Sequence, residues 1–284
     1  MRLDETRRQE LRRFFLSQQM PDGSFCGRGQ RGDLYYTSFA LRGLFLLGGL
    51  GPNLAENVSR YLQTFELNKL NPADLTSWLI AKSLLYPIQD TTFSETEICS
   101  ALNRWNDFRR DGGYATSRNT NHASVYTTFL AAVSFELLGC GDKIDAISYD
   151  SVLKHQRGDG GFSELTILKH SGTNPTAAAI ALLTMKEISV PNREQTANFL
   201  KQRQLISGGF QAHERIPVAD LLSTFSAITA LRDLDAPTEQ TPQSLQNYLR
   251  SLRSPTGGYF GVVGDTVADA EYTFYGMTLE DCDN

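Results

Sequence analysis

The feature that most constrains the fold of this chain is a glycine turn that recurs at a nearly fixed interval. From Gly112 the turns follow at steps of 48, 48 and 49 residues, and the gap from Gly23 to Gly112 is 89 residues, close to two periods. A fixed period in this range is typical of arrays in which each unit packs on its neighbours. The five turns are Asp22-Gly23-Ser24-Phe25, Asp111-Gly112-Gly113-Tyr114, Asp159-Gly160-Gly161-Phe162, Ser207-Gly208-Gly209-Phe210 and Thr256-Gly257-Gly258-Tyr259.

Each turn separates two kinds of helical segment. Upstream segments carry one apolar stripe, as in Ile98, Leu102 and Trp105, which favours helices with one buried and one solvated face. Downstream segments are apolar nearly all round, which favours helices that are buried on every face. The amphipathic helices are predicted near residues 3–18, 53–66, 93–108, 145–156, 192–204 and 240–252. The apolar helices are predicted at residues 33–47, 74–85, 123–138, 174–185, 220–231 and 269–279.

Twelve alternating helices predict six hairpins, with the amphipathic helices in an outer ring and the apolar helices in an inner ring. We therefore expect an all-α fold, a closed (α/α)6 toroid forming a single domain over residues 1–284, with an open superhelix of helix pairs as the alternative. Paired glycines permit positive φ between two helices, and the aromatic residue that follows would fill the hub. The expected repeats are about 3–48, 53–86, 92–140, 143–187, 191–234 and 238–281, the second shortened because it lacks the glycines.

The composition narrows the class of protein. With 284 residues, 40% hydrophobic and 21% charged, the chain is long enough to bury a large core and is not typical of a disordered protein. Its formal net charge of −5 argues against nucleic acid as a partner. Four cysteines are too few for a disulfide framework, and the charged start differs from a signal peptide. Since the longest largely apolar stretch, residues 44–51, is less than half a membrane span, we expect a cytoplasmic protein without a transmembrane segment.

The starts of the inner helices carry acids at a regular spacing. Asp33, Asp220 and Asp269 each lie four residues before a threonine, and Asp74 lies three residues before Ser77. Helix N-capping is one explanation, because Asp is among the best capping residues. The other is that converging helix N-termini attract an anion such as diphosphate. Basic residues occupy the same loops: Arg28, Arg31, Arg118, Lys169, His170, His213 and Arg215.

Aromatic residues are frequent on the predicted inner helices. Core packing accounts for most large aromatic side chains on buried helices. A ring of six helices, however, leaves a central space, and aromatic walls with a cationic mouth would suit a long apolar ligand with an anionic head. The aromatic residues expected to contact such a ligand are Tyr35, Tyr36, Trp78, Tyr126, Phe225 and Tyr275.

The repeated turn, followed each time by a buried helix, resembles the repeats of protein prenyltransferase β-subunits and squalene cyclases over roughly residues 7–281. The prenyltransferase segment GGFxG…DxCYSFW is similar to Gly208-Gly209-Phe210-Gln211 followed by Asp220-Leu221-Leu222-Ser223-Thr224-Phe225. The segment GG…DxxHTxxG is similar to Gly257-Gly258-Tyr259 followed by Asp269-Ala270-Glu271-Tyr272-Thr273-Phe274-Tyr275-Gly276. The resemblance implies an α/α toroid that acts on or binds an isoprenoid.

The zinc site that this resemblance implies is incomplete. Prenyltransferases of this kind hold zinc with the Asp and Cys of DxC and with the His of the last segment. Here Asp220 is kept, while Leu222 stands in the cysteine position and Tyr272 in the histidine position. A catalytic zinc needs three protein ligands and an open position, and none of the cysteines at positions 26, 99, 140 and 282 lies near enough in sequence to substitute. We therefore expect no zinc, and Mg²⁺ only as the companion of a diphosphate substrate.

The resemblance also implies where a diphosphate and an acid would lie. The basic residues that clamp diphosphate in prenyltransferases fall at His213 and Arg215, with His170 standing in for a histidine of the fourth repeat. The DxDD acid of the cyclases is absent, and the nearest acid is Glu271, two residues before Thr273. A buried carboxyl group there could act as a general acid, whereas a solvent-exposed capping acid is the alternative.

The leading hypothesis is a prenyltransferase-like or terpene-cyclase-like protein that binds an isoprenoid, as its diphosphate, in a central aromatic cavity and without a conventional zinc site. The alternative is a non-catalytic toroid that serves as a binding or scaffold module. A partner, either a helical α-subunit-like chain or a second copy, would meet the basic first helix, although an exposed basic helix without a partner is also common. The candidate catalytic residues are Asp220, Asp269, Glu271 and Tyr272. The candidate diphosphate contacts are Arg118, Lys169, His170, His213 and Arg215, and the arginines of the first helix are Arg7, Arg8, Arg12 and Arg13.

Overall fold

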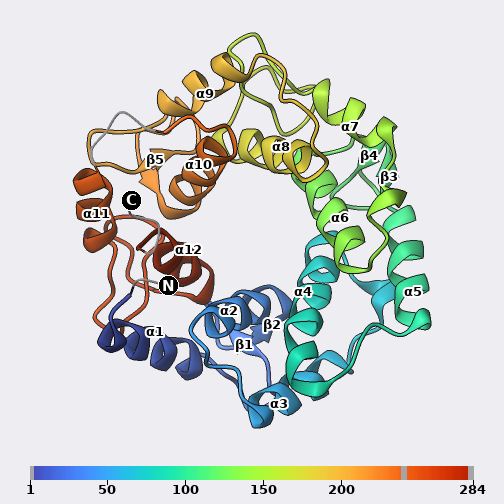
Figure 1. Cartoon of the computed structure of the whole chain (residues 1–284), viewed down its shortest axis with the longest axis vertical. Helices are drawn as coiled ribbons and strands as arrows, with labels where there is room; N and C mark the ends of the chain where they lie inside the picture. The colour runs from blue at the N-terminus through green and yellow to red at the C-terminus, as the bar shows by residue number, and fades with distance from the viewer. Residues whose placement is uncertain (1–2, 238–241, 281–284) are drawn as a thin grey trace. The chain divides into compact units, whose positions relative to one another are not determined.

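The computed structural model describes residues 3–237 and 242–280, and within this part of the chain all twelve predicted helices are present (Figure 1). The amphipathic helices are α1 (Glu5–Ser17), α3 (Pro52–Leu62), α5 (Glu95–Asn106), α7 (Ala146–Leu153), α9 (Arg193–Lys201) and α11 (Pro242–Ser251). The apolar helices are α2 (Leu34–Leu46), α4 (Pro72–Gln89), α6 (Val125–Leu137), α8 (Thr173–Met185), α10 (Leu221–Asp233) and α12 (Ala270–Glu280). Residues 240 and 241 of the predicted sixth outer helix, and Cys282, lie outside the described ranges.

The chain forms two compact units. Unit 1 comprises the described residues of Met1–Arg104 and Leu249–Asn284, and unit 2 comprises those of Trp105–Tyr248. In unit 1, α2 packs between α4 and α12, while α1 covers α2 and α3 covers α4. In unit 2, α8 packs between α6 and α10. Helix α7 packs on α6 and α8, and α9 packs on α10, so α7 and α9 form the outer layer of this unit (Figure 1). Both units therefore have one layer of apolar helices and one layer of amphipathic helices.

The glycine turn fixes how one repeat packs on the next. The first glycine of every turn has positive φ, as at Gly208 with φ +97°. A Cβ atom on Gly208 would lie 2.3 Å from the carbonyl oxygen of Ser244 on α11, so only glycine allows this close approach. The aromatic residue that follows is buried, and its N–H donates to a threonine hydroxyl on the inner helix of its own repeat. These pairs are Phe25–Thr37, Tyr114–Thr128, Phe162–Thr176, Phe210–Thr224 and Tyr259–Thr273.

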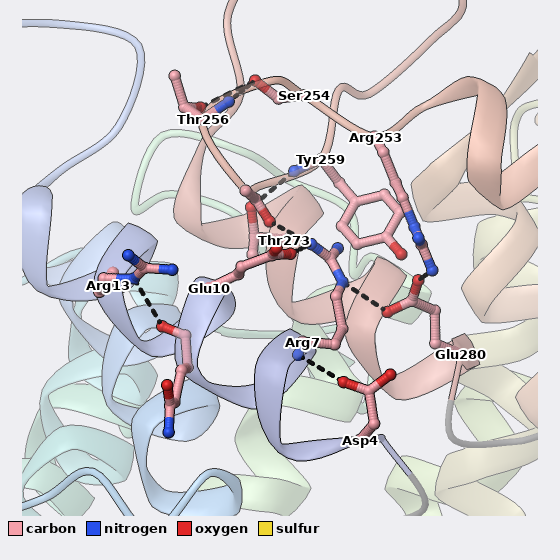
Figure 2. A network of polar contacts seen from close by, with 12 residues as sticks. Asp4, Arg7, Glu10, Arg13, Arg253, Ser254, Thr256, Tyr259, Thr273 and Glu280 are labelled. Carbon is pink, nitrogen blue, oxygen red and sulfur yellow. Dashed lines mark hydrogen bonds and ion pairs between the residues drawn. The ribbon is translucent and has the colours of Figure 1, made fainter.

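The last turn packs on the first helix in the same manner (Figure 2). A Cβ atom on Gly257 would lie 3.2 Å from the carbonyl oxygen of Glu10 on α1. The guanidinium of Arg7 donates to the Gly257 carbonyl at 3.0 Å and pairs at 3.2 Å with the Glu280 carboxylate. In Figure 2 the side chains of Arg7 and Arg253 approach Glu280 from opposite sides, and both form ion pairs with it. The first and last repeats are therefore neighbours in unit 1, as a closed array requires and an open superhelix does not.

This packing also accounts for the basic character of α1. Arg7 is buried in the network of Figure 2, and the guanidinium groups of Arg8 and Arg12 both donate to the carbonyl oxygen of Leu47. Arg13 alone of the four arginines is exposed. Three of these side chains thus hold unit 1 together, which leaves less of α1 for an acidic partner than the sequence suggested.

The second repeat departs most from its sequence prediction. Helix α4 begins at Pro72 rather than Asp74, because Asn71 is the N-cap and accepts the N–H of Asp74 at 2.9 Å. Pro72 suits the first helical position, where its missing N–H costs no hydrogen bond. The helix continues past Pro87 to Gln89, and a short 3-10 helix, η1 (Leu67–Lys69), precedes it instead of a glycine turn.

Two-residue antiparallel ladders flank three of the turns and are the only strands in the described residues. They are β1 (Phe25–Cys26) with β2 (Gly32–Asp33), β3 (Arg109–Arg110) with β4 (Gly113–Tyr114), and β5 (Phe210–Gln211) with β6 (Ala219–Asp220). Within the described ranges, none of the helices has the length and apolar character needed to cross a membrane.

Candidate functional site

The acids that precede the inner helices are N-caps. A carboxylate oxygen of Asp33, Asp220 and Asp269 accepts the N–H of the residue three positions later, at 2.7, 2.7 and 2.9 Å. The threonine four residues after each acid accepts the N–H of the buried turn aromatic. The Asp/Thr spacing is therefore a scaffold device, and any chemical role of these acids comes in addition to capping.

In unit 1 the start of α12 lies against Arg28, from the loop before α2. The guanidinium donates from Nε to Oδ2 of Asp269 at 2.9 Å and from Nη2 to Oδ2 of Asp265 at 2.6 Å. Burial raises the pKa of Asp269 above its usual range despite these contacts, because its side chain is fully excluded from solvent. Partial burial would also raise the pKa of Asp265, but the hydrogen bonds from Arg28 and from the N–H groups of Thr266 and Val267 together outweigh it and lower the pKa of that carboxyl. The guanidinium also lies over the Tyr272 ring, 5.2 Å from its centroid.

Glu271 lies two residues after Asp269 and is buried. Its Oε1 accepts the phenol O–H of Tyr35 at 2.7 Å and that of Tyr275 at 3.3 Å. Burial raises the pKa of Glu271, and the nearby Asp269 carboxylate adds to this effect. Within residues 3–237 and 242–280, the second oxygen, Oε2, makes no hydrogen bond. Glu271 is thus a buried acid with one carboxyl oxygen held by two tyrosines.

Aromatic rings pack next to this acid. The ring of Phe39 lies 5.0 Å from that of Tyr35, 5.4 Å from that of Tyr275 and 5.7 Å from that of Phe274. The Arg42 guanidinium covers the Phe39 ring at 4.6 Å. We call Arg28, Asp265, Asp269, Glu271, Tyr35 and Tyr275 the acid cluster.

In unit 2 the loops before α8 and α10 bring together three of the predicted basic residues, His170, His213 and Arg215, which we call the basic cluster. Nη2 of Arg215 lies 2.7 Å from Nε2 of His170, and the two imidazole rings are 5.8 Å apart. The backbone N–H of Arg215 donates to Nδ1 of His213 at 3.2 Å, which orders the loop. In the described part of the chain no carboxylate contacts this cluster, since Glu214 turns to Arg203 at 3.7 Å.

The other predicted site residues lie apart from these clusters or belong to the core. Lys169 is exposed beside His170, whereas Arg118 forms an ion pair with Asp107. Trp78 is buried, donates from Nε1 to the Leu62 carbonyl at 3.0 Å and stacks on Phe93. The half-buried Tyr36 ring fills the space where a Cβ atom on Gly27 would lie. On unit 2, Tyr126 is exposed beside Phe129 on α6, and Phe225 is half-buried on α10.

Glu164 is an acid that the sequence did not single out. It lies two residues after the turn aromatic Phe162, and its Oε1 accepts the Ser124 hydroxyl and, at 3.3 Å, the N–H of Tyr126. Burial raises the pKa of Glu164 above its usual range. Because Glu164 contacts the start of α6 from the next repeat, forty residues away, no local sequence pattern marks it.

The residues at the expected zinc positions do not fit zinc. One carboxylate oxygen of Asp220 accepts the Ser223 N–H as a helix cap, and Leu222 has no atom that could bind a metal. The ring of Tyr272 lies under the Arg28 guanidinium. Among the described residues, no group of three or more His, Cys, Asp or Glu side chains is arranged to hold a metal ion. No chemical step is therefore assigned to zinc.

Comparison with known proteins places this arrangement in a family. The chain matches the model of the prenyltransferase alpha-alpha toroid domain over residues 1–211 and 176–281. It is 30% identical over 150 residues to the farnesyltransferase subunit beta of Arabidopsis thaliana. That alignment covers 51% of this chain but only 30% of the relative, so the chain spans less than a third of that protein's length.

Solved structures extend the likeness to the whole fold. The Candida albicans protein geranylgeranyltransferase-I complexed with GGPP superposes with a TM-score of 0.76 at 16% identity, covering 96% of this chain and 91% of that one. A single-residue variant of the type II terpene cyclase MstE from Scytonema, in complex with geranylgeranyl dihydroxybenzoate, superposes with a TM-score of 0.63 at 13% identity, covering 96% of this chain and 94% of that one. The fold is therefore the (α/α)6 toroid expected from the sequence, and the chain belongs to the prenyltransferase alpha-alpha toroid domain family.

Proposed function

We propose that this protein binds an isoprenoid diphosphate and that the basic cluster of unit 2 holds the diphosphate. The observation that carries the proposal is the 2.7 Å contact between Arg215 and His170, two basic side chains with no carboxylate against them in the described residues. Arginine stays charged at any physiological pH, and its planar fork matches phosphate oxygens. An anion that joined these side chains would complete their hydrogen bonds. Lys169, exposed next to His170, adds a further cation at the same place.

The isoprenoid chain would lie on apolar side chains of the same unit. Tyr126 and Phe129 on α6, together with Leu222 and Phe225 on α10, keep part of their surface exposed. Helix α8, which packs between α6 and α10, carries the mostly small residues Thr-Ala-Ala-Ala-Ile-Ala at positions 176–181. Large side chains on both sides of a helix with small ones would accept a flexible hydrocarbon. The ligands named for the solved relatives, GGPP and geranylgeranyl dihydroxybenzoate, support an isoprenoid here.

The reaction, on this proposal, does not use a zinc-bound thiolate. Leu222 and Tyr272 replace two of the ligands that a zinc-dependent prenyltransferase would need. The diphosphate itself would bring Mg²⁺, because the cation prefers phosphate oxygens and water to protein cages. A partner subunit, helical or a second copy, remains part of the proposal because the Arabidopsis relative is named as a β-subunit.

The first test combines metal analysis with thermal shifts against prenyl diphosphates of several chain lengths, with and without Mg²⁺. We expect no bound zinc and a stabilisation that grows with chain length. Arg215→Ala should weaken binding by about tenfold or more, because a hydrogen bond to a charged group contributes about 1.5–3 kcal/mol. The control is Lys154→Ala, an exposed cation of unit 2 that belongs to neither loop. Equal losses in both variants, or no stabilisation by any diphosphate, would favour the scaffold alternative.

A second function is favoured by Glu271. We infer that its protonated Oε2 starts a carbocation reaction by protonating an isoprenoid alkene. In this step the O–H bond breaks, the alkene π electrons form a new C–H bond, and the positive charge remains on the other alkene carbon. Tyr35 and Tyr275 then stabilise the carboxylate through the hydrogen bonds that they already make. The aromatic rings beside Glu271 would stabilise the cation.

Turnover assays with Glu271→Gln test this role directly. General acid catalysis contributes about 10²–10⁴-fold, so the variant should lose at least about a hundredfold in turnover while still binding ligand. Asp220→Ala and Tyr272→Phe test two of the three other candidates, and unchanged turnover would remove these two. Binding without turnover in the wild-type protein would leave a binding module rather than an enzyme.

A further inference from the structure

Two adjoining loops of unit 2 expose a group of large apolar side chains. They precede α8 and α10, and they are joined by the Arg215–His170 contact and by the N–H of Thr173, which donates to the Ala212 carbonyl at 2.9 Å. Adjacent exposed apolar side chains on a protein surface indicate contact with another surface. We call them the apolar loop patch: Ile167 (64% exposed), Leu168 (45%), Ile216 (52%) and Val218 (50%).

The toroid architecture does not require this patch. The corresponding loop before α6, residues 116–122, reads Thr-Ser-Arg-Asn-Thr-Asn-His and has no large apolar side chain. It connects the same kind of turn to the same kind of inner helix. Loops of this kind therefore differ in apolar character, since the loop before α12 also exposes Val263 and Val267.

Basic side chains lie next to the apolar residues in both loops. Lys169 and Arg215 are exposed and directly follow or precede the apolar residues. Of the carboxylates in the same loops, Glu164 accepts the Ser124 hydroxyl, and the exposed Glu214 pairs with Arg203 at 3.7 Å. Neither carboxylate pairs with Lys169 or Arg215, although the whole chain carries a net charge of −5.

The patch is also held in a defined conformation. The Arg157 guanidinium donates to the carbonyl oxygens of Thr166 and Leu168 at 2.8 and 3.1 Å. In the other loop the N–H of Ile216 donates to the His213 carbonyl at 2.9 Å. The apolar side chains are thus presented by ordered backbone and lose little conformational freedom when they are covered.

We propose that the apolar loop patch docks on an anionic phospholipid surface. The four apolar side chains would enter the boundary between headgroups and acyl chains, and Lys169 and Arg215 would pair with lipid phosphates. Apolar side chains interleaved with cations suit this interface, since burial and electrostatic attraction act together. The proposal goes beyond diphosphate binding and does not depend on it, although Lys169 and Arg215 belong to both.

Co-sedimentation with phospholipid vesicles tests the proposal on the full chain. Wild-type protein should bind vesicles of phosphatidylcholine with phosphatidylserine and bind pure phosphatidylcholine more weakly. The double variant Ile167→Ser, Ile216→Ser should lower the partition coefficient by about tenfold or more, because two large apolar side chains no longer insert. Lys169→Gln should lower it about fivefold on the anionic vesicles alone. Added salt should weaken wild-type binding in the same way.

The matched control is Ile206→Ser. Ile206 is 99% exposed in unit 2, but it belongs to the glycine turn that packs on α11 rather than to the two loops. Equal losses in this control and in the double variant would overturn the proposal. Failure of the wild-type protein to bind either kind of vesicle would also overturn it and would favour a protein partner for the patch. Affinity for soluble geranyl diphosphate, measured on the double variant Ile167→Ser, Ile216→Ser and on the Ile206→Ser control, should not change, which separates this proposal from the diphosphate site.

Discussion

The starts of α10 and α12 are built on the same plan and carry opposite chemistry. Each begins with an aspartate N-cap, Asp220 or Asp269, and each has a threonine four residues later that accepts a buried aromatic N–H. At α12 the cap is fully buried under Arg28, and the acid Glu271 follows it. At α10 the cap has no cation against it in the described residues, and the neighbouring loop carries bases instead.

The difference separates scaffold from site. The two starts share the aspartate cap and the threonine that accepts the aromatic N–H, and these features keep the repeats packed. The two starts differ only in the charged side chains at the helix start and in the preceding loop. The acid cluster pairs its one cation with carboxylates, whereas no carboxylate of the described residues contacts the basic cluster, which is therefore the better place for an external anion.

The largest expected effect is a difference in unfolding free energy between the variants Arg28→Ala and Arg215→Ala. Arg28→Ala leaves the buried Asp269 carboxylate without its cation and should lower the free energy of unfolding by about 2 kcal/mol, less than for a fully buried pair because Arg28 is partly exposed. Arg215→Ala removes no ion pair and should change it by less than about 0.5 kcal/mol. Urea unfolding of both variants measures the difference. Rescue of Arg28→Ala by Asp269→Asn would attribute the loss to the unpaired carboxylate, and equal losses at both arginines would refute the distinction.

A smaller effect is expected at the cap that the two starts share. Asp220→Ala should cost about 1 kcal/mol of unfolding free energy, because the Ser223 N–H loses its acceptor, while Asp220→Asn should cost much less because Asn caps nearly as well. Thermal unfolding of the pair checks this. A full loss of turnover in Asp220→Asn with unchanged stability would instead return Asp220 to the list of catalytic residues.

The smallest effect is a pH trend at Glu271. Because burial raises its pKa, the folded protein holds this proton to higher pH than the unfolded chain does. The stability that comes from the proton is fully present below the ordinary glutamate pKa and is lost as pH rises through the raised value. The Tm of Glu271→Gln relative to wild type should therefore increase as pH rises above the ordinary glutamate pKa of about 4.3. A difference in Tm that stays constant as pH rises would show that folding does not raise the pKa of Glu271.

The sequence predicted the fold because its signals are local and repeated. Glycine turns one period apart, each between an amphipathic and an apolar segment, gave all twelve helices within a few residues. The error at α4 arose because Asp74 follows the same acid-before-hydroxyl pattern as the true caps, whereas Asn71 does the capping. The closure of the last turn on α1 was expected from the repeat number, but the residues that make it were not.

The site was predictable only where its members lie in neighbouring loops. His170, His213 and Arg215 meet because two successive repeats place their loops side by side. The partners of Glu271 could not be inferred, since Tyr35 is 236 residues away and no periodicity links the two. Arg28 was noted as a loop base, but its pairing with Asp265 and Asp269 depends on the first and last repeats being neighbours. Trp78 was expected to contact a ligand, whereas it is buried and donates to the Leu62 carbonyl. No sequence pattern marks Leu62 as its partner.

The most direct test of the central claim compares one isoprenoid with two head groups. Isothermal titration of geranylgeranyl diphosphate and of geranylgeraniol, each into wild-type protein and Arg215→Ala, measures what the basic cluster contributes. The account predicts that wild-type protein binds the diphosphate at least about tenfold more tightly than the alcohol and that Arg215→Ala removes most of this preference. Equal affinity for diphosphate and alcohol in the wild-type protein, or a preference that survives in Arg215→Ala, would contradict it.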